Sequence, residues 1–201
     1  MKRSKALAPA VLLLVPALFL AGCGSDDDKP SSSSSPSSSA SESPSASPSE
    51  TADASGLIPL EGNGFTVSLP DKASSNETTI TTPAGDVPAT VYATEDDKDG
   101  GFLAALVTYP SGVTVDLDGA VKGIAKGYTG TVETNETIEV EGNPARQARV
   151  DGVIQGEDYT FYILAVDVDD KLFQLIHAVK GAAPATPPAI LGEVAATLSF
   201  G

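Results

Sequence analysis

The chain has one cysteine and one histidine in 201 residues, and it has no tryptophan. A single cysteine, Cys23, excludes an intramolecular disulfide. Zinc and similar metals take sulfur and nitrogen ligands, and Cys23 with His177 cannot supply a full set. The sequence also has no glycine-rich phosphate-binding loop and no Gly-x-Ser-x-Gly elbow. We therefore expect no metal and no cofactor, and we predict that the protein is not an enzyme.

Positive charge is scarce as well. Lysine and arginine number 12 against 27 aspartates and glutamates, which gives a net charge of −15. Three of the basic residues, Lys2, Arg3 and Lys5, fall in a segment that we expect to be removed. So acidic a surface repels phosphate backbones and anionic lipid head groups. We expect no nucleic-acid partner, and attachment to a membrane must be covalent.

The apolar segment at residues 6–20 is too short for a permanent membrane anchor. A spanning helix needs about 20 apolar residues, and Pro9 and Pro16 interrupt this segment. A basic start precedes it and small residues follow it, which is the layout of a secretory signal peptide. Residues 1–22 are therefore predicted to be a signal peptide that is removed.

The junction Leu20-Ala21-Gly22-Cys23 resembles the lipobox of bacterial lipoproteins. The resemblance implies that a signal peptidase recognises Leu20, Ala21 and Gly22 and cleaves after Gly22, and that Cys23 carries diacylglycerol on its sulfur. Two acyl chains, such as palmitate, anchor a protein stably, whereas one chain holds it only reversibly. We expect the mature protein on the outer face of the cytoplasmic membrane, held there through lipid on Cys23.

Residues 23–55 are predicted to be a disordered tether. Serine dominates residues 31–55, with Pro36, Pro44 and Pro48 among the serines and no aromatic or large aliphatic residue. Such a segment cannot bury enough apolar surface to offset its ordering entropy. The acidic run at residues 26–28 is interpreted as solvated charge rather than a metal site. Glycosylation of this linker stays open.

Residues 56–201 are predicted to form a single folded domain. Alternating apolar residues indicate strands, and apolar residues at helical spacing after Asp116 and after Pro187 indicate two helices. The predicted strands are 65–69, 78–82, 89–94, 102–109, 131–140, 145–151, 159–168 and 172–179, and the predicted helices are 117–128 and 187–198.

The segment 159–166 is apolar on both faces, which indicates a central strand with one layer above it and another below. The short links between successive strands favour antiparallel pairing. The predicted architecture is therefore α+β, a largely antiparallel sheet of six or seven strands flanked by helices on both faces.

Three segments stand out: the opening GFTVSLP at residues 64–70, the turn GNPAR at 142–146, and the final helix running into LSF at 198–200. Together they resemble the PsbP-like fold family, in the form found in actinobacterial cell-envelope lipoproteins. The resemblance covers roughly residues 57–200. It implies a fold and a binding or accessory role, and it brings no catalytic residues.

Several residues invite a chemical interpretation. His177 lies on an apolar strand face and has no nucleophile or orienting carboxylate at a suitable spacing, so packing is favoured over a role as general base. The acidic turns at 97–100 and 167–170 do not match the twelve-residue calcium loop with its closing glutamate. Tyrosines are suited to recognition sites, but core packing is their commoner use; the residues concerned are Tyr109, Tyr128, Tyr159 and Tyr162.

The sequence favours a monomeric, non-enzymatic binding or accessory module of the cell envelope, with a protein or small ligand as its partner. One alternative is a carrier of a hydrophobic ligand or lipid, which requires a lipid-sized cavity. A second alternative is a carboxylate-based hydrolase, which requires two acids facing each other in a cleft.

Overall fold

The computed structural model describes residues 56–82, 85–95, 100–110 and 112–201. The predicted signal peptide, the lipobox residues Leu20, Ala21, Gly22 and Cys23, the tether, and residues 97–99 of the first acidic turn lie outside these residues. Within the described ranges, none of the helices has the length and apolar character to cross a membrane.

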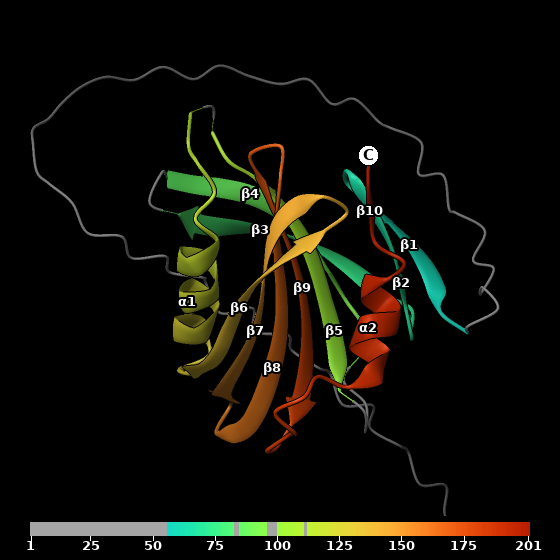
Figure 1. Ribbon diagram of the computed structural model, residues 1–201, viewed down its shortest axis with the longest axis vertical. Coiled ribbons are helices and arrows are strands. Elements are labelled where there is room, and N and C mark those ends of the chain that lie inside the picture. Colours follow the sequence, from blue (N-terminus) through green and yellow to red (C-terminus); the bar gives the residue numbers. More distant parts are fainter. Residues whose placement is uncertain (1–55, 83–84, 96–99, 111) are drawn as a thin grey trace, which may run out of the picture.

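The described residues form ten strands and two helices (Figure 1). In chain order they are β1 (Ile58–Gly62), β2 (Phe65–Leu69), β3 (Ser74–Thr82), β4 (Gly85–Ala93), β5 (Gly101–Thr108), α1 (Leu117–Gly127), β6 (Thr131–Val140), β7 (Asn143–Ile154), β8 (Glu157–Val168), β9 (Lys171–Lys180), α2 (Ala189–Ala195) and β10 (Ser199–Phe200).

Seven strands form one antiparallel sheet in the order β3-β4-β5-β9-β8-β7-β6, which confirms the predicted sheet of six or seven strands. The sheet consists of two meanders, β3 to β5 and β6 to β9, which are connected in the chain through α1. The meanders join where β9 pairs with β5. Residues distant in sequence, such as Phe102 and His177, therefore stand opposite each other.

Tight turns close the hairpins of the second meander. Both central residues of each turn have positive φ: Glu141 and Gly142, Gln155 and Gly156, Asp169 and Asp170. Such two-residue turns match the right-handed twist of paired strands, and glycine or aspartate is well suited to them. Asp169 and Asp170 of the acidic run thus form a hairpin turn, and Asp167 lies in the last residues of β8.

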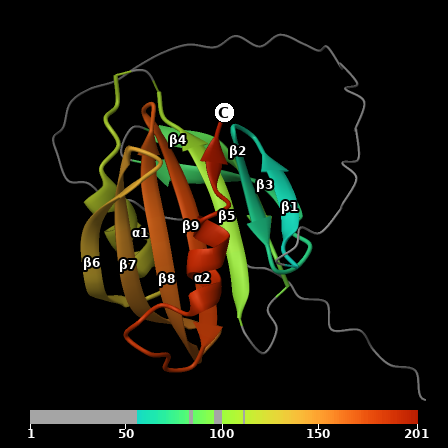
Figure 2. The same ribbon diagram turned by 45° about the vertical axis from the view of Figure 1, so that its right-hand side comes forward.

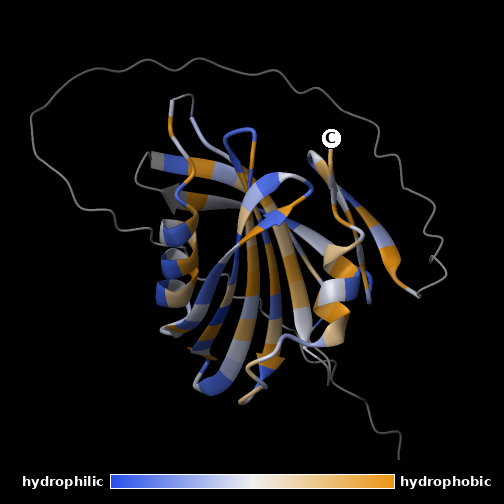
Figure 3. Cartoon of the chain, viewed as in Figure 1, coloured by the Kyte–Doolittle hydropathy of each residue, from blue (hydrophilic) through white to orange (hydrophobic). Residues whose placement is uncertain are grey.

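α1 covers one face of the large sheet. Asp116 caps it, since its Oδ1 accepts a hydrogen bond from the Gly119 amide at 2.9 Å. Val121 and Ile124 are fully buried and pack in one cluster with Phe161 and Ile163 of β8. Figure 3 shows α1 blue on the side away from the sheet, as expected for an amphipathic helix.

The opposite face is covered differently. A three-stranded sheet in the order β1-β2-β10 packs on it together with α2, and Figure 2 shows both in front of the large sheet. Phe65 and Val67 of β2 and Val194 of α2 share one apolar cluster with Leu164 and Val166 of β8. β8 is therefore buried on both faces, as the sequence predicted for a central strand.

The expected elements need three corrections. β1 and β10 were not predicted, because each is short and owes its pairing to β2. α2 ends at Ala195 rather than running to residue 198. The Thr197 hydroxyl donates a hydrogen bond to the Val194 carbonyl and accepts one from the Ser68 amide, each at 2.7 Å. These two bonds connect the end of α2 to β2.

Candidate functional site

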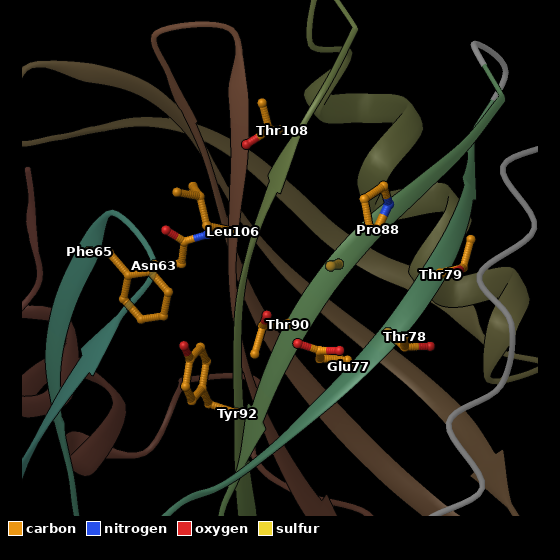
Figure 4. A pocket seen from close by; sticks show the side chains of 11 residues that line it. Asn63, Phe65, Glu77, Thr78, Thr79, Pro88, Thr90, Tyr92, Leu106 and Thr108 are labelled. Atoms are coloured by element: carbon orange, nitrogen blue, oxygen red, sulfur yellow. The ribbon is translucent and has the colours of Figure 1, made fainter. Parts of the chain in front are cut away.

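A pocket of about 430 Å³ lies where the edge of the small sheet meets the outer half of the large one (Figure 4). The hairpin between β1 and β2 forms one wall, and β3, β4 and β5 form the floor. Eleven residues line it: Asn63, Phe65, Glu77, Thr78, Thr79, Pro88, Ala89, Thr90, Tyr92, Leu106 and Thr108.

Strand register brings the floor residues together. Glu77 of β3 stands opposite Thr90 of β4, and Thr90 stands opposite Leu106 of β5, so the three form one row across the sheet. Tyr92 follows Thr90 on the same face because side chains alternate along a strand. Figure 4 shows Thr90 between Tyr92 and Glu77.

Pro88 lies at the position in β4 where the pairing with β5 has ended. β4 pairs with β5 over residues 89–93, and Pro88 lies just outside that stretch, opposite Thr79 of β3. Proline has no amide hydrogen for a ladder and is tolerated where pairing has ended. The floor is therefore open toward solvent at this end.

Gly64 positions the wall. Its φ of +90° is a conformation that favours glycine, and a Cβ built at this position would lie 3.1 Å from Cδ2 of Leu106. A side chain at this position would require the Leu106 methyl group to shift by a few tenths of an ångström, so glycine favours the close approach of the hairpin tip to β5. The ring of Phe65, next along the chain, then packs edge-to-face on Tyr92 with the ring centroids 5.7 Å apart.

The lining consists mainly of groups that form hydrogen bonds. Glu77 supplies the one carboxylate among the lining residues, and the other polar groups are an amide, four threonine hydroxyls and a phenol. Histidine, cysteine and serine do not appear in the lining. A set of this kind can donate and accept hydrogen bonds, but it holds no paired nucleophile and base.

The four tyrosines that the sequence singled out do not meet at this pocket. Tyr128 stacks on Phe161 with 4.2 Å between centroids, and Tyr159 and Tyr109 pack in the same α1-side cluster. Tyr162 is buried on the opposite face, where it donates a hydrogen bond to the Pro184 carbonyl. Burial raises the pKa of Tyr162 and of Tyr128, which suits packed and neutral phenols.

His177 lies in the interior. It is 1% exposed, stacks on Phe102 with 4.2 Å between centroids and 5° between planes, and has Tyr162 opposite it on β8. These contacts fit the packing role predicted from the sequence. His177 is not among the residues that line the pocket.

The acidic turn after β8 shows one perturbed carboxylate. The pKa of Asp167 is raised, chiefly by burial and then by the charge of Asp170. Among the described residues, no three histidine, cysteine, aspartate or glutamate side chains lie together as a metal site would require.

A second hollow lies along α1 and is more open to solvent. Lys122 and Lys126, one helical turn apart, line it together with Thr129 and Val132. This hollow is too open for two lysine side chains to select one class of ligand. The pocket beside β3–β5 is therefore taken as the candidate site.

Comparison by sequence finds no match among known protein families or curated proteins. Comparison by structure finds the solution structure of cyanobacterial PsbP, CyanoP, from Synechocystis sp. PCC 6803, with a TM-score of 0.48 and 11% identity over 76% of this chain and 91% of that one. It also finds a protein of unknown function, PA94, from Pseudomonas aeruginosa, with a TM-score of 0.32 and 12% identity over 68% of this chain and 87% of that one.

The pocket residues were not singled out from the sequence. A weak signal was present: Thr90 and Tyr92 are polar positions alternating with Ala89 and Val91 in a strand. That pattern predicts a face turned away from the core. It cannot reveal that the β1–β2 hairpin, more than twenty residues earlier in the sequence, packs beside this face and forms a pocket with it.

Proposed function

We propose that this protein is a lipid-anchored binding module of the bacterial cell envelope, with one PsbP-like domain and a helix on either face of its sheet. The lipobox at residues 20–23 and the serine-rich tether support the anchoring. The pocket between the β1–β2 hairpin and β3–β5 supports the binding role, because it gathers hydrogen-bonding groups without a nucleophile and a base. That pocket is the observation on which the functional proposal rests.

The lining disfavours a lipid carrier. An acyl chain placed against Glu77, Thr90 and Asn63 would leave their polar groups without partners, which costs free energy for each group that loses contact with water. A polar ligand, or a polar part of a partner, fits the same surface without that cost.

A carboxylate-based hydrolase is also less well supported. Glycoside hydrolysis needs two carboxyl groups across the scissile bond, about 5 to 10 Å apart. Glu77 has no carboxylate partner among the residues that line the pocket. The described lining therefore lacks a group that the hydrolytic role requires.

The anchoring is tested by Cys23→Ala. We expect the variant either to accumulate as uncleaved precursor or to move from the membrane fraction to the medium, as followed by fractionation and intact mass. Membrane-bound, mature Cys23→Ala protein would contradict the anchoring.

The binding role is tested by filling the pocket. In cells lacking the chromosomal copy, full-length Thr90→Trp protein should be lipidated and abundant but unable to reverse the effects of the deletion. Thr131→Trp, at an exposed position on β6, is the matched control and should act as the wild type does. Full activity of the Thr90→Trp protein would rule out a role for the pocket.

A further inference from the structure

We infer that the pocket beside β3–β5 binds a neutral saccharide, with Glu77 and Thr90 making the main polar contacts and Tyr92 and Leu106 contacting the apolar face of a sugar ring. This inference rests on the proposed binding function and names the ligand class of the same site. Three properties of the lining carry it: its charge, its balance of donors and acceptors, and its apolar floor.

Charge excludes anionic ligands. Among the described residues that line the pocket, Glu77 is the one with a charge, and neither lysine nor arginine is among them. The whole chain carries a net charge of −15. A phosphate, sulfate or carboxylate group would enter a negative potential and meet no positive partner. The ligand is therefore neutral or cationic.

The hydrogen-bonding inventory favours the neutral class. An ammonium ion is a donor only, so it is matched best by acceptor-only groups such as carboxylates. Here Glu77 is the one acceptor-only side chain, while the hydroxyls of Thr90 and Tyr92 and the amide of Asn63 both donate and accept. Sugar hydroxyls have the same dual character, and a carboxylate can accept from two neighbouring hydroxyls.

The apolar part of the lining matches the remaining surface of a sugar. Leu106 is half-buried on the floor, and the half-buried ring of Tyr92 is held edge-to-face by Phe65. Pyranose rings have apolar C–H faces that pack on such surfaces. A volume of about 430 Å³, open on one side, suits a sugar or a short saccharide end more than an enclosed molecule.

The assay uses full-length lipidated protein in detergent micelles and follows amide signals by NMR during titration. The probes are maltotriose, cellotriose, mannotriose and chitotriose as neutral trisaccharides, with trigalacturonate as the anionic one and the glucosamine trimer as the cationic one. We expect at least one neutral probe to shift the signals of Glu77, Thr90 and Tyr92. Trigalacturonate should shift none of them.

Two variants locate the binding. Glu77→Gln removes the charged acceptor, and Thr90→Val removes a hydroxyl while keeping the shape of the side chain. Each should weaken binding by a few-fold to about tenfold, as expected for the loss of one hydrogen bond. Glu136→Gln and Thr131→Val on the distant strand β6 are the matched controls and should leave the affinity unchanged.

Three outcomes would overturn the inference: no response to any neutral trisaccharide at 10 mM, tighter binding of either charged probe, or binding that survives both pocket variants. The proposed function fails separately. If Thr90→Trp abolishes the cellular role while no neutral sugar binds, the pocket is functional and its ligand belongs to another class. If Thr90→Trp acts as wild type, the pocket has no role in the cell.

Discussion

The centre of the large sheet and its β3 edge differ in what covers them. β8 is buried along most of its length, with Phe161, Ile163 and Ala165 facing α1 and Tyr162, Leu164 and Val166 facing the small sheet and α2. β3, at the far edge, is a strand of serine and threonine in which Ile80 is a buried residue. One continuous sheet thus has an apolar centre and a polar margin.

This difference explains where a binding site can form. At the centre, every side chain is used to fill the core, and an opening there would create a costly cavity. At the margin, the small sheet reaches only as far as the β1–β2 hairpin. Beyond Phe65 the floor combines polar residues such as Glu77 and Thr90 with the apolar Leu106. The stability of the domain therefore lies mainly in β7, β8 and β9, while the pocket lies at β3, β4 and β5.

The largest expected effect is at the centre. Ile163→Ala removes a side chain that is fully buried in the α1-side cluster, and it should lower the free energy of unfolding by about 2–5 kcal/mol through lost burial and a new cavity. Val153→Ala, at a valine that is 39% exposed, should change it by less than about 0.5 kcal/mol. Chemical denaturation of the full-length protein measures both. Equal losses would mean that the apolar centre does not dominate stability.

A smaller effect is expected at the wall of the pocket. Gly64→Ala forces a left-handed backbone on alanine, which costs about 1–2 kcal/mol, and it brings a methyl group against Leu106. Gly112→Ala introduces the same backbone strain at φ +84°, with nothing within 4 Å of the new Cβ. The two should destabilise to different degrees, and only Gly64→Ala should shift the Leu106 methyl signals in NMR spectra. Identical spectra around Leu106 would show that the hairpin does not rest on β5.

The smallest effect concerns pH at the end of β8. Because burial raises the pKa of Asp167, the folded state holds this proton more tightly than the unfolded state does, and ionisation costs stability. The cost is present above the folded pKa and disappears as the pH falls through it. Asp167→Asn should therefore raise stability at pH 7 by no more than about 0.5 kcal/mol, and the gain should vanish at low pH. A variant less stable than wild type at pH 7 would contradict the assigned cause of the shift.

Much of the fold was predictable because its signals are local. The apolar run at 159–166 indicated a central strand, and Asp116 followed by Leu117, Val121 and Ile124 indicated a capped helix; both are present. His177 was expected to pack, and it stacks on Phe102. β1 was missed because it contains Pro59 and has no buried residue, unlike β2 of the same length, and β10 was missed because two residues show no periodicity.

By itself the sequence determined the charge of the protein, the central position of β8, the capped helix α1 and the expectation of a lipid on Cys23, because each depends on composition or on neighbouring residues. Tertiary structure alone decided the pocket. Asn63, Glu77, Thr90 and Leu106 lie far apart in the chain, and strand register and the seating of Gly64 on β5 bring them together. Contacts of that kind produce no periodic pattern in the sequence, because they join residues that are distant in the chain. Each of these residues is ordinary for a strand or a turn, and only the packing of the small sheet on the large one brings them to one pocket.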